Sequence, residues 1–537
     1  MQYVQKFIIY QNGDEMIINL KTIKEFLSIE RITFILVFTI FCFLFVGNFL
    51  LSDSVEVSFF KYIDDGAFNQ SVYEWQTALK NLDLHKVFNF NHCNYGWIFW
   101  AFNGIISFPC YCLNMEFMTI SIHRNISCIM SFLSLYYIYK ILGNYTKVKF
   151  YKILVVLSIL FIHSFIFYSS IFDTTAMIGF FGVLSLYFLL KDKELSIKTI
   201  LLSSFCIGVS AAVKLSGLIL APVIALLLID RLKHNFSPKS INKLILYICF
   251  ALFIFFLLYN PMIYLNFTKS EINSFDLNSI VLQSPKFKFF LQGITEHLYR
   301  LPFILFCLCL YISNIVRNIR NRQYDFLYYL TGLIIVFIAF SFIDEEKSWL
   351  FPIKYYMGII FLLPFSIIEI ANYKKREIRW ILSCIVIFLL FQHKNFIPDL
   401  LMSYNINRKE ELIIYNQLRE ILKPNKDGII SYKLNDINII PYLNIRKNVE
   451  MELLYFKPNE NAFYPQIDDS CDYYVFIKRT PDCCFDSTQE KMYLKKVFEE
   501  INNFENNKIG NSIYMKIYED KNITAFRKID EYINQEG

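Results

Sequence analysis

The sequence predicts an all-α polytopic membrane protein with a small α/β domain at its C-terminal end. The 537 residues are 55% hydrophobic, with 56 Phe and 36 Tyr, and the mean hydropathy of +0.38 is too high for an ordinary soluble protein. Apolar runs of spanning length recur between residues 32 and 395. From about residue 396 the composition changes to Asn, Lys, Glu and Asp with shorter apolar runs.

The first element, residues 1–31, is a charged segment. A cleaved signal peptide is apolar close to its start, so we expect this segment to be a cytoplasmic tail. The formal net charge of the chain is +6. Its Lys and Arg residues are spread over short loops and form no single basic patch, which argues against a nucleic-acid partner.

A first span is predicted at about 32–51, followed by a long outer loop at 53–118. Five apolar residues recur in this loop at helical spacing: Phe68, Val72, Trp75, Leu79 and Leu82. They predict an amphipathic helix on the membrane surface. The apolar segment 95–109 is short for a span and is interrupted by glycines, so we expect a second juxtamembrane or re-entrant helix there.

Hydropathy predicts ten further spans, about eleven in all. They lie at about 120–142, 153–170, 174–190, 199–215, 216–230, 242–259, 301–316, 325–343, 349–371 and 378–395. Every even-numbered span is followed by a basic cluster: Lys147, Lys149 and Lys152; Lys191, Lys193 and Lys198; Arg231, Lys233, Lys239 and Lys243; Arg317, Arg320 and Arg322; Lys374, Lys375, Arg376 and Arg379. Lys and Arg residues are enriched in the cytoplasmic loops of membrane proteins, so we expect these loops to be cytoplasmic and the intervening loops to be extracytoplasmic.

The last element, residues 396–537, then lies outside the membrane on the extracytoplasmic side. Residues 409–422 have a helical pattern, and 428–432, 471–479 and 512–518 have strand patterns. The segment is large enough for its own core. In an extracytoplasmic domain, Cys471 can pair with either Cys483 or Cys484, which leaves one thiol over.

The candidate site residues lie on the predicted outer side. Asp64 and Asp65 come just beyond the first span, where an acidic pair is either functional or part of a solvated loop. Asp173, at the turn between the third and fourth spans, caps the next helix, serves in a site, or does both. Lys214 and Lys354 lie near the outer ends of spans, where a lysine either snorkels or binds an anion. Weaker candidates are His92, Arg124 and His163.

Carboxylates and lysines at a membrane surface suit transfer from a lipid phosphate. A carboxylate can take a proton from an attacking hydroxyl, and lysines can stabilise the charge on a departing phosphate. This chemistry requires Asp64 and Asp173 to meet in one cavity at the outer boundary of the bilayer.

The membrane part, 32–395, resembles the GT-C glycosyltransferases, especially the bacterial branch similar to the lipid A aminoarabinose transferase and to protein O-mannosyltransferases. The matching motifs, in order, are Asp64-Asp65 after the first span, YGWIF at 95–99, SSIFDTT around Asp173, KLSGLILAP at 214–222, Asn260-Pro261 at the end of the seventh span, and FPIKYY with Lys354 and Tyr355. Each motif alone is weak, and their order and common side make the resemblance more specific.

The resemblance implies an inverting sugar transfer from a polyprenyl-phosphate donor to a glycan, lipid or protein acceptor, in a bacterial inner membrane. It implies that Asp64 is the base, that Asp65 and Asp173 orient the acceptor or position the site, and that Lys214 and Lys354 bind the phosphate. Tyr355, His92 and Arg124 are further candidates for substrate binding.

The chain also departs from the family. A lysine–proline motif of the lipid A branch is replaced by HCNYG, so His92 is only a loose substitute. The late basic residue, often Arg in the family, is Lys354, which lacks a bidentate grip on phosphate. No residue set for a divalent metal stands out beyond the carboxylates, and since some members need a metal and others do not, the resemblance leaves a metal open.

Two other classes remain as alternatives. A surface-polysaccharide polymerase of the O-antigen type would use arginines in large late loops, where 261–300 offers few basic residues. A non-enzymatic lipid-linked sugar flippase would favour inverted repeats and broken helices near the midplane, which the sequence lacks.

Overall fold

The computed structural model describes residues 6–11, 14–19, 29–50, 63–90, 95–162, 165–192, 194–233, 238–264, 295, 299–319, 324–341, 361–391, 409–422, 430–435, 449–457, 461–464, 467–478, 487–506 and 512–529. The chain divides into two compact units. The first comprises Met1–Gly47, Leu84–Trp100 and Asn125–Leu400, and the second comprises Asn48–Asp83, Ala101–Arg124 and Leu401–Gly537.

The N-terminal segment contains a hairpin of β1 (Lys6–Gln11) and β2 (Asp14–Asn19). The strands are antiparallel, and Gln11 pairs with Asp14 in their register. The intervening sequence is Asn12-Gly13, a dipeptide that favours two-residue hairpin loops when it separates apolar runs. The sequence analysis missed this signal within the expected charged tail.

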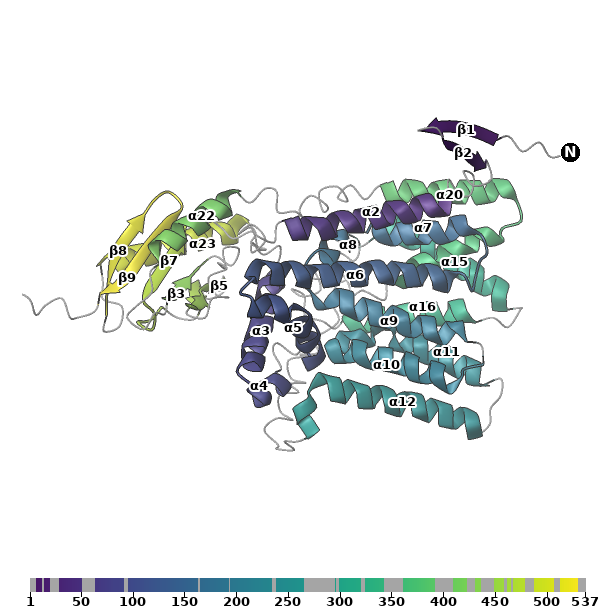
Figure 1. The fold of residues 1–537 in the computed structure, drawn as a ribbon, viewed down its shortest axis with the longest axis horizontal. Helices are drawn as coiled ribbons and strands as arrows, with labels where there is room; N and C mark the ends of the chain where they lie inside the picture. Colours follow the sequence, from purple (N-terminus) through teal and green to yellow (C-terminus); the bar gives the residue numbers. More distant parts are fainter. Residues whose placement is uncertain are drawn as a thin grey trace, which may run out of the picture. The chain divides into compact units, whose positions relative to one another are not determined.

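Helices form the first unit (Figure 1). They are α2 (Ile29–Leu50), α4 (Leu84–Phe88), α6 (Glu116–Leu142), α7 (Lys149–Leu160), α8 (Phe165–Ser169), α9 (Thr174–Lys191), α10 (Ile197–Val213), α11 (Ala221–Lys233), α12 (Pro238–Tyr259), α15 (Leu301–Ile319), α16 (Asp325–Ser341) and α20 (Arg376–Phe391), with 3-10 segments η2 (Leu215–Leu220), η3 (Pro261–Tyr264) and η5 (Leu363–Asn372). Helices α2 and α6 run on into the second unit.

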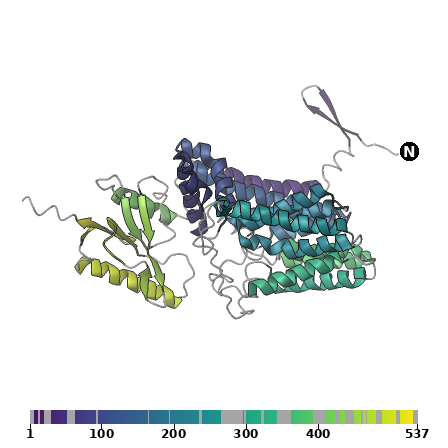
Figure 2. The same ribbon diagram turned by 90° about the horizontal axis from the view of Figure 1, so that it is seen from below.

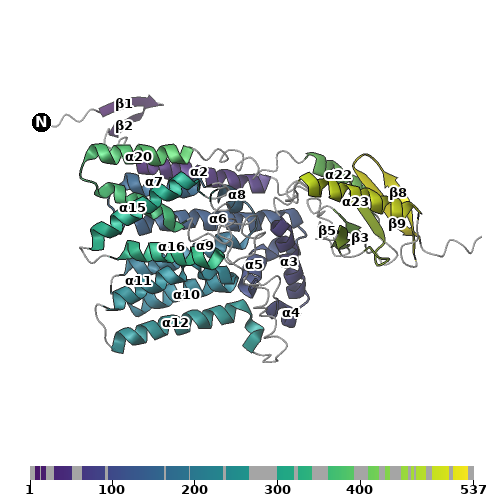
Figure 3. The same cartoon turned by 180° about the vertical axis from the view of Figure 1, so that it is seen from behind.

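Helix α10 packs between α9 and α12 (Figures 1 and 3). Small residues allow these close contacts. A Cβ atom added at Gly208 of α10 would lie 2.7 Å from the Ala251 carbonyl oxygen of α12, and Ser210 is fully buried. Interfaces of small residues are typical of helices that pack closely within membranes.

Six helices in the described part of the chain are long and apolar enough to cross a membrane. These helices comprise residues Arg31–Leu50, Met118–Leu142, Thr174–Lys191, Leu215–Leu232, Pro238–Tyr259 and Leu301–Ile319. Other apolar helices are shorter: Trp97–Cys112, Ile197–Val213, Asp325–Val336 and Leu363–Asn372. The all-α membrane architecture is therefore confirmed, whereas the number of eleven spans is not.

The predicted outer loop contains α3 (Ile63–Lys80) and α5 (Trp97–Cys112). The expected apolar face of α3 is buried at Phe68, Val72 and Trp75. Trp75 packs against α5, where a Cβ atom added at Gly104 would lie 2.5 Å from the indole ring. Leu82 was wrongly assigned to this face, because α3 ends before it and its side chain is 78% exposed.

The C-terminal part of the second unit contains a five-stranded mixed sheet with the order β4-β3-β7-β9-β8. Its strands are β3 (Ile430–Leu434), β4 (Val449–Leu453), β7 (Tyr473–Ile477), β8 (Ile513–Glu519) and β9 (Ile523–Ile529). Strand β3 is parallel to β4 and β7, and β9 is antiparallel to β7 and β8. A separate two-stranded sheet pairs β5 (Tyr455–Lys457) with β6 (Ala462–Tyr464).

One helix covers each face of this sheet (Figure 2). Val475 and Ile477 of β7 pack with α22 (Lys409–Ile421), whereas Tyr474 and Phe476 pack with α23 (Ser487–Asn506). Residues alternate between faces along a strand, so β7 is buried on both sides. The α/β fold predicted for the C-terminal part of the chain is thereby confirmed.

Candidate functional site

Lys214 lies at the break between α10 and η2. The residue is extended, with φ −164° and ψ 143°, and ends α10. The chain then turns back onto α10 because position 217 is glycine: an added Cβ atom would lie 2.0 Å from the Ser210 carbonyl oxygen. The Ser210 hydroxyl donates to the Gly217 carbonyl at 3.1 Å. The interruption places Lys214 between two apolar segments.

Tyr95 positions the Lys214 ammonium group. Lys214 is half-buried, its Nζ donates to the Tyr95 hydroxyl at 3.3 Å, and it lies 4.6 Å from the centre of the tyrosine ring. The Tyr95 side chain is itself buried. The face of the ring attracts the cation electrostatically, so the contact holds the ammonium group in place.

Gly96 fixes the start of α5 against the bundle. Its amide donates to the Val213 carbonyl at 3.1 Å. A Cβ atom added at Gly96 would lie 1.8 Å from the Ala212 carbonyl oxygen and 3.1 Å from Cα of Tyr259. Only glycine permits this approach, and it brings Tyr95 to the ends of α10 and α12.

Asp173 is the N-cap of α9 and is buried. Its Oδ1 accepts a hydrogen bond from the Thr175 amide at 2.7 Å and another from the Thr175 hydroxyl. The capping role expected for this residue is therefore confirmed. The preceding Phe172 stacks on Phe99 of α5, with ring centres 5.1 Å apart. Phe99 lies one turn beyond Tyr95, so Asp173 and Lys214 both adjoin the start of α5.

The end of α12 reaches the same region. The Asn260 side chain donates to the Asn89 side chain at 3.2 Å and accepts from the Met262 amide at 3.0 Å. Segments remote in sequence thus lie around the start of α5 in the first unit. We call four residues on these segments the α5-start cluster: Tyr95, Asp173, Lys214 and Asn260. Its members supply an ammonium group, a carboxylate, a phenol and an amide, of which the ammonium group and the phenol are in contact.

Several predicted site residues cannot be placed in this cluster. His92, His163, Lys354 and Tyr355 lie outside the described residues. Asp64 and Asp65 lie in the first turn of α3, but only their backbone is described. Arg124 lies within α6 and is 1% exposed.

A buried polar network in the second unit was missed by sequence reasoning. His123 is fully buried; its Nδ1 lies 2.7 Å from Oδ1 of Asn69, and its Nε2 lies 2.8 Å from the Ser107 hydroxyl. The Gln76 amide donates to the same hydroxyl at 2.7 Å. The network ties α3, which carries Asp64 and Asp65, to α5 and α6. The sequence did carry a signal for this network, namely the adjacent residues His123 and Arg124 within an apolar helical segment.

The C-terminal part holds Cys471 as a buried free thiol that donates to the Tyr473 carbonyl at 3.1 Å. Its two predicted alternative partners, Cys483 and Cys484, lie outside the described residues. Within the described ranges, no group of three or more His, Cys, Asp or Glu residues is arranged to hold a metal ion.

No family model and no curated protein matches the chain. Among solved structures, the chain is similar to ArnT from Cupriavidus metallidurans bound to undecaprenyl phosphate, with a TM-score of 0.58 and 11% identity over 92% of this chain and 98% of that chain. It is also similar to the same protein in the apo state, with a TM-score of 0.54 and 11% identity over 90% and 97% of the two chains. The predicted GT-C fold is confirmed.

Proposed function

We propose that the chain is a membrane glycosyltransferase that moves a sugar from a polyprenyl-phosphate donor to an acceptor on the extracytoplasmic side. The observation that carries the proposal is the α5-start cluster in a chain with the fold of ArnT. Lys214 offers an ammonium group, positioned by Tyr95, between two apolar segments. A lipid phosphate matches these features, because its charge pairs with the lysine while its chain packs on apolar helices. The similar ArnT structure is bound to undecaprenyl phosphate.

The proposed reaction inverts the configuration at the anomeric carbon of the sugar. The Asp64 carboxylate takes the proton of the acceptor hydroxyl as that oxygen attacks the anomeric carbon. The bond from this carbon to the phosphate oxygen breaks, and the polyprenyl phosphate leaves with the electron pair. Lys214 and Lys354 stabilise its charge.

Asp65 and Asp173 orient the acceptor or hold the site. For Asp173, the cap to Thr175 supports a positioning role, because it fixes the start of α9 against Phe99. The buried network around His123 supports the placement of α3, since it holds that helix against α5 and α6.

We further propose that residues 32–395 form the catalytic membrane domain and that 396–537 form an extracytoplasmic domain. The N-terminus is then cytoplasmic, and the protein lies in a bacterial inner membrane. The acceptor is a glycan, a lipid or a protein of the cell envelope. The donor can be identified as the lipid-linked sugar that accumulates in a strain from which the gene for this protein has been deleted.

The test compares Asp64→Asn with Glu74→Gln, a charge-neutralising control on the exposed face of the same helix. With the donor so identified, Asp64→Asn should lower transfer by at least about a hundredfold, while undecaprenyl phosphate binding stays unchanged. Glu74→Gln should leave both unchanged. Transfer retained by Asp64→Asn removes this residue as the base, and assays with and without a chelator decide whether a divalent metal takes part.

A further inference from the structure

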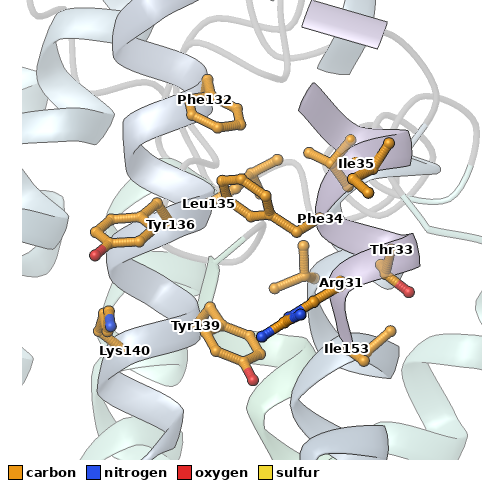
Figure 4. A pocket seen from close by; sticks show the side chains of 12 residues that line it. Arg31, Thr33, Phe34, Ile35, Phe132, Leu135, Tyr136, Tyr139, Lys140 and Ile153 are labelled. Carbon is orange, nitrogen blue, oxygen red and sulfur yellow. The ribbon is translucent and has the colours of Figure 1, made fainter. Parts of the chain in front are cut away.

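A groove of about 380 Å³ opens between α2, α6 and α7 in the first unit (Figure 4). Its volume is in the range of small-molecule sites. Phe34 and Ile35 of α2 and Phe132 and Leu135 of α6 line its apolar part. Phe34 and Ile35 are about half exposed, so the groove is open along its side rather than enclosed in the bundle.

One end of the groove is cationic. Arg31 in the first turns of α2 and Lys140 near the end of α6 both line it, and none of its lining residues, all in the described part of the chain, is acidic. Lys140 lies 5.2 Å from the ring centre of Tyr136. Lys152 of α7 lies 4.2 Å from that of Tyr139. Figure 4 shows the Arg31 side chain directed toward Tyr139, so positive charge gathers at the end of the groove beyond Phe132 and Ile35.

The length of the groove matches one leaflet of a bilayer. On α6 its lining runs from Phe132 to Lys140, which is about 12 Å at the rise of an α-helix. Half of the hydrocarbon core is about 15 Å thick. An acyl chain that occupies one leaflet fits the length of the groove. A polyprenyl chain long enough to cross the whole bilayer is longer than the groove.

We propose that this groove binds an anionic phospholipid of the leaflet that faces the basic loops. The phosphate lies between Arg31 and Lys140, and one acyl chain lies along Phe34 and Leu135. Basic pockets between membrane helices on the cytoplasmic side bind anionic headgroups. In the predicted orientation the site is at the opposite membrane face from Lys214, so it is separate from the proposed donor site.

The experiment is native mass spectrometry of the full chain, extracted from bilayers of phosphatidylglycerol and phosphatidylcholine that carry the same acyl chains. We expect phosphatidylglycerol to be retained roughly tenfold over phosphatidylcholine. The double variant Arg31→Gln/Lys140→Gln should remove this preference. Ile35→Trp, which fills the groove and keeps both charges, should lower retention of phosphatidylglycerol as well.

The matched control is Lys239→Gln/Lys243→Gln, which removes two cations from the start of α12, outside the groove. This control should retain phosphatidylglycerol as the unmodified chain does. The proposal is overturned by equal retention of the two lipids, or by an equal loss in the control. It is also overturned if undecaprenyl phosphate displaces the bound phosphatidylglycerol, because the groove would then belong to the glycosyl donor.

Discussion

Lys214 is the residue on which the proposed phosphate contact depends most directly. Lys214→Gln keeps a polar side chain, one bond shorter than that of lysine, and removes the charge that lies over Tyr95. A hydrogen bond to a charged group contributes about 1.5–3 kcal/mol, so affinity for undecaprenyl phosphate should fall roughly ten- to a hundredfold. Lys214→Arg, which keeps the positive charge, should bind undecaprenyl phosphate more tightly than Lys214→Gln does. Lys198→Gln, at the other end of α10, is the control, and unchanged affinity in Lys214→Gln contradicts the contact.

Gly217 is a second residue for which the structure leaves no room for a side chain. In Gly217→Ala the new methyl group meets the Ser210 backbone oxygen, which cannot move without shifting α10. Overpacking of this kind costs about 1–3 kcal/mol, and thermal unfolding of the purified chain should show the loss. The control is Gly182→Ala, where the nearest atom is the flexible end of Leu220 at 3.0 Å. Equal stability of the two variants would show that the return of η2 onto α10 tolerates a side chain.

Sequence reasoning found isolated polar residues more readily than their partners. Asp173 and Lys214 stand out because each interrupts an apolar run. Tyr95 stands out only as part of the YGWIF motif, since nothing local indicates that its hydroxyl meets a lysine 119 positions away. His123 was overlooked for the same reason, as its partners come from α3 and α5.

Among the elements, a charge cluster joins Lys433 of β3 to Glu452 of β4 and to Asp468, which precedes β7, and we expect it to stabilise the C-terminal sheet. Lys433 is 2% exposed and contacts Asp468 at 2.8 Å and Glu452 at 3.0 Å. Burial alone raises the pKa of Asp468, but hydrogen bonds from Lys433 and Ser470 outweigh it and lower the pKa to about 2. The charged form is thus favoured in the folded state.

The corresponding variant is Asp468→Asn. We expect it to lower stability by about 1 kcal/mol at neutral pH, because Asp468 is half exposed and Glu452 still pairs with Lys433. Hydrogen exchange of the β7 amides in the full chain should quicken roughly fivefold. Below about pH 4 the unfolded Asp gains its proton, so the difference should close as the pH falls toward 2. Glu490→Gln, which neutralises an exposed carboxylate at the start of α23, is the control and should exchange like the unmodified chain.

Helices were easier to predict than strands. Hydropathy finds long apolar helices because one pattern extends over many residues. It does not separate a span from a shorter buried helix, as in α7, where eight of twelve residues are buried. The strand β9 and the helix α23 were missed because their patterns are short or strongly polar, and tertiary packing determines them.

At the scale of the whole molecule, the predicted orientation can be tested by cysteine labelling. On a background without exposed native cysteines, Asn144→Cys, Lys239→Cys and Lys375→Cys should be protected from a membrane-impermeant reagent in intact cells. Lys521→Cys in the C-terminal domain should react. Labelling of the first three from outside would reverse the orientation and place Lys214 on the cytoplasmic side.

The edge of the C-terminal sheet has a further consequence. Strand β8 is an outer strand, with Ile513 and Met515 about half exposed. Its ladder with β9 is irregular between Lys516 and Tyr518, and Lys516 pairs with Glu505 and Glu519. Irregular pairing and charge on an edge oppose the recruitment of a strand from another molecule. Neighbouring copies of the protein are thereby kept from pairing strand to strand and aggregating.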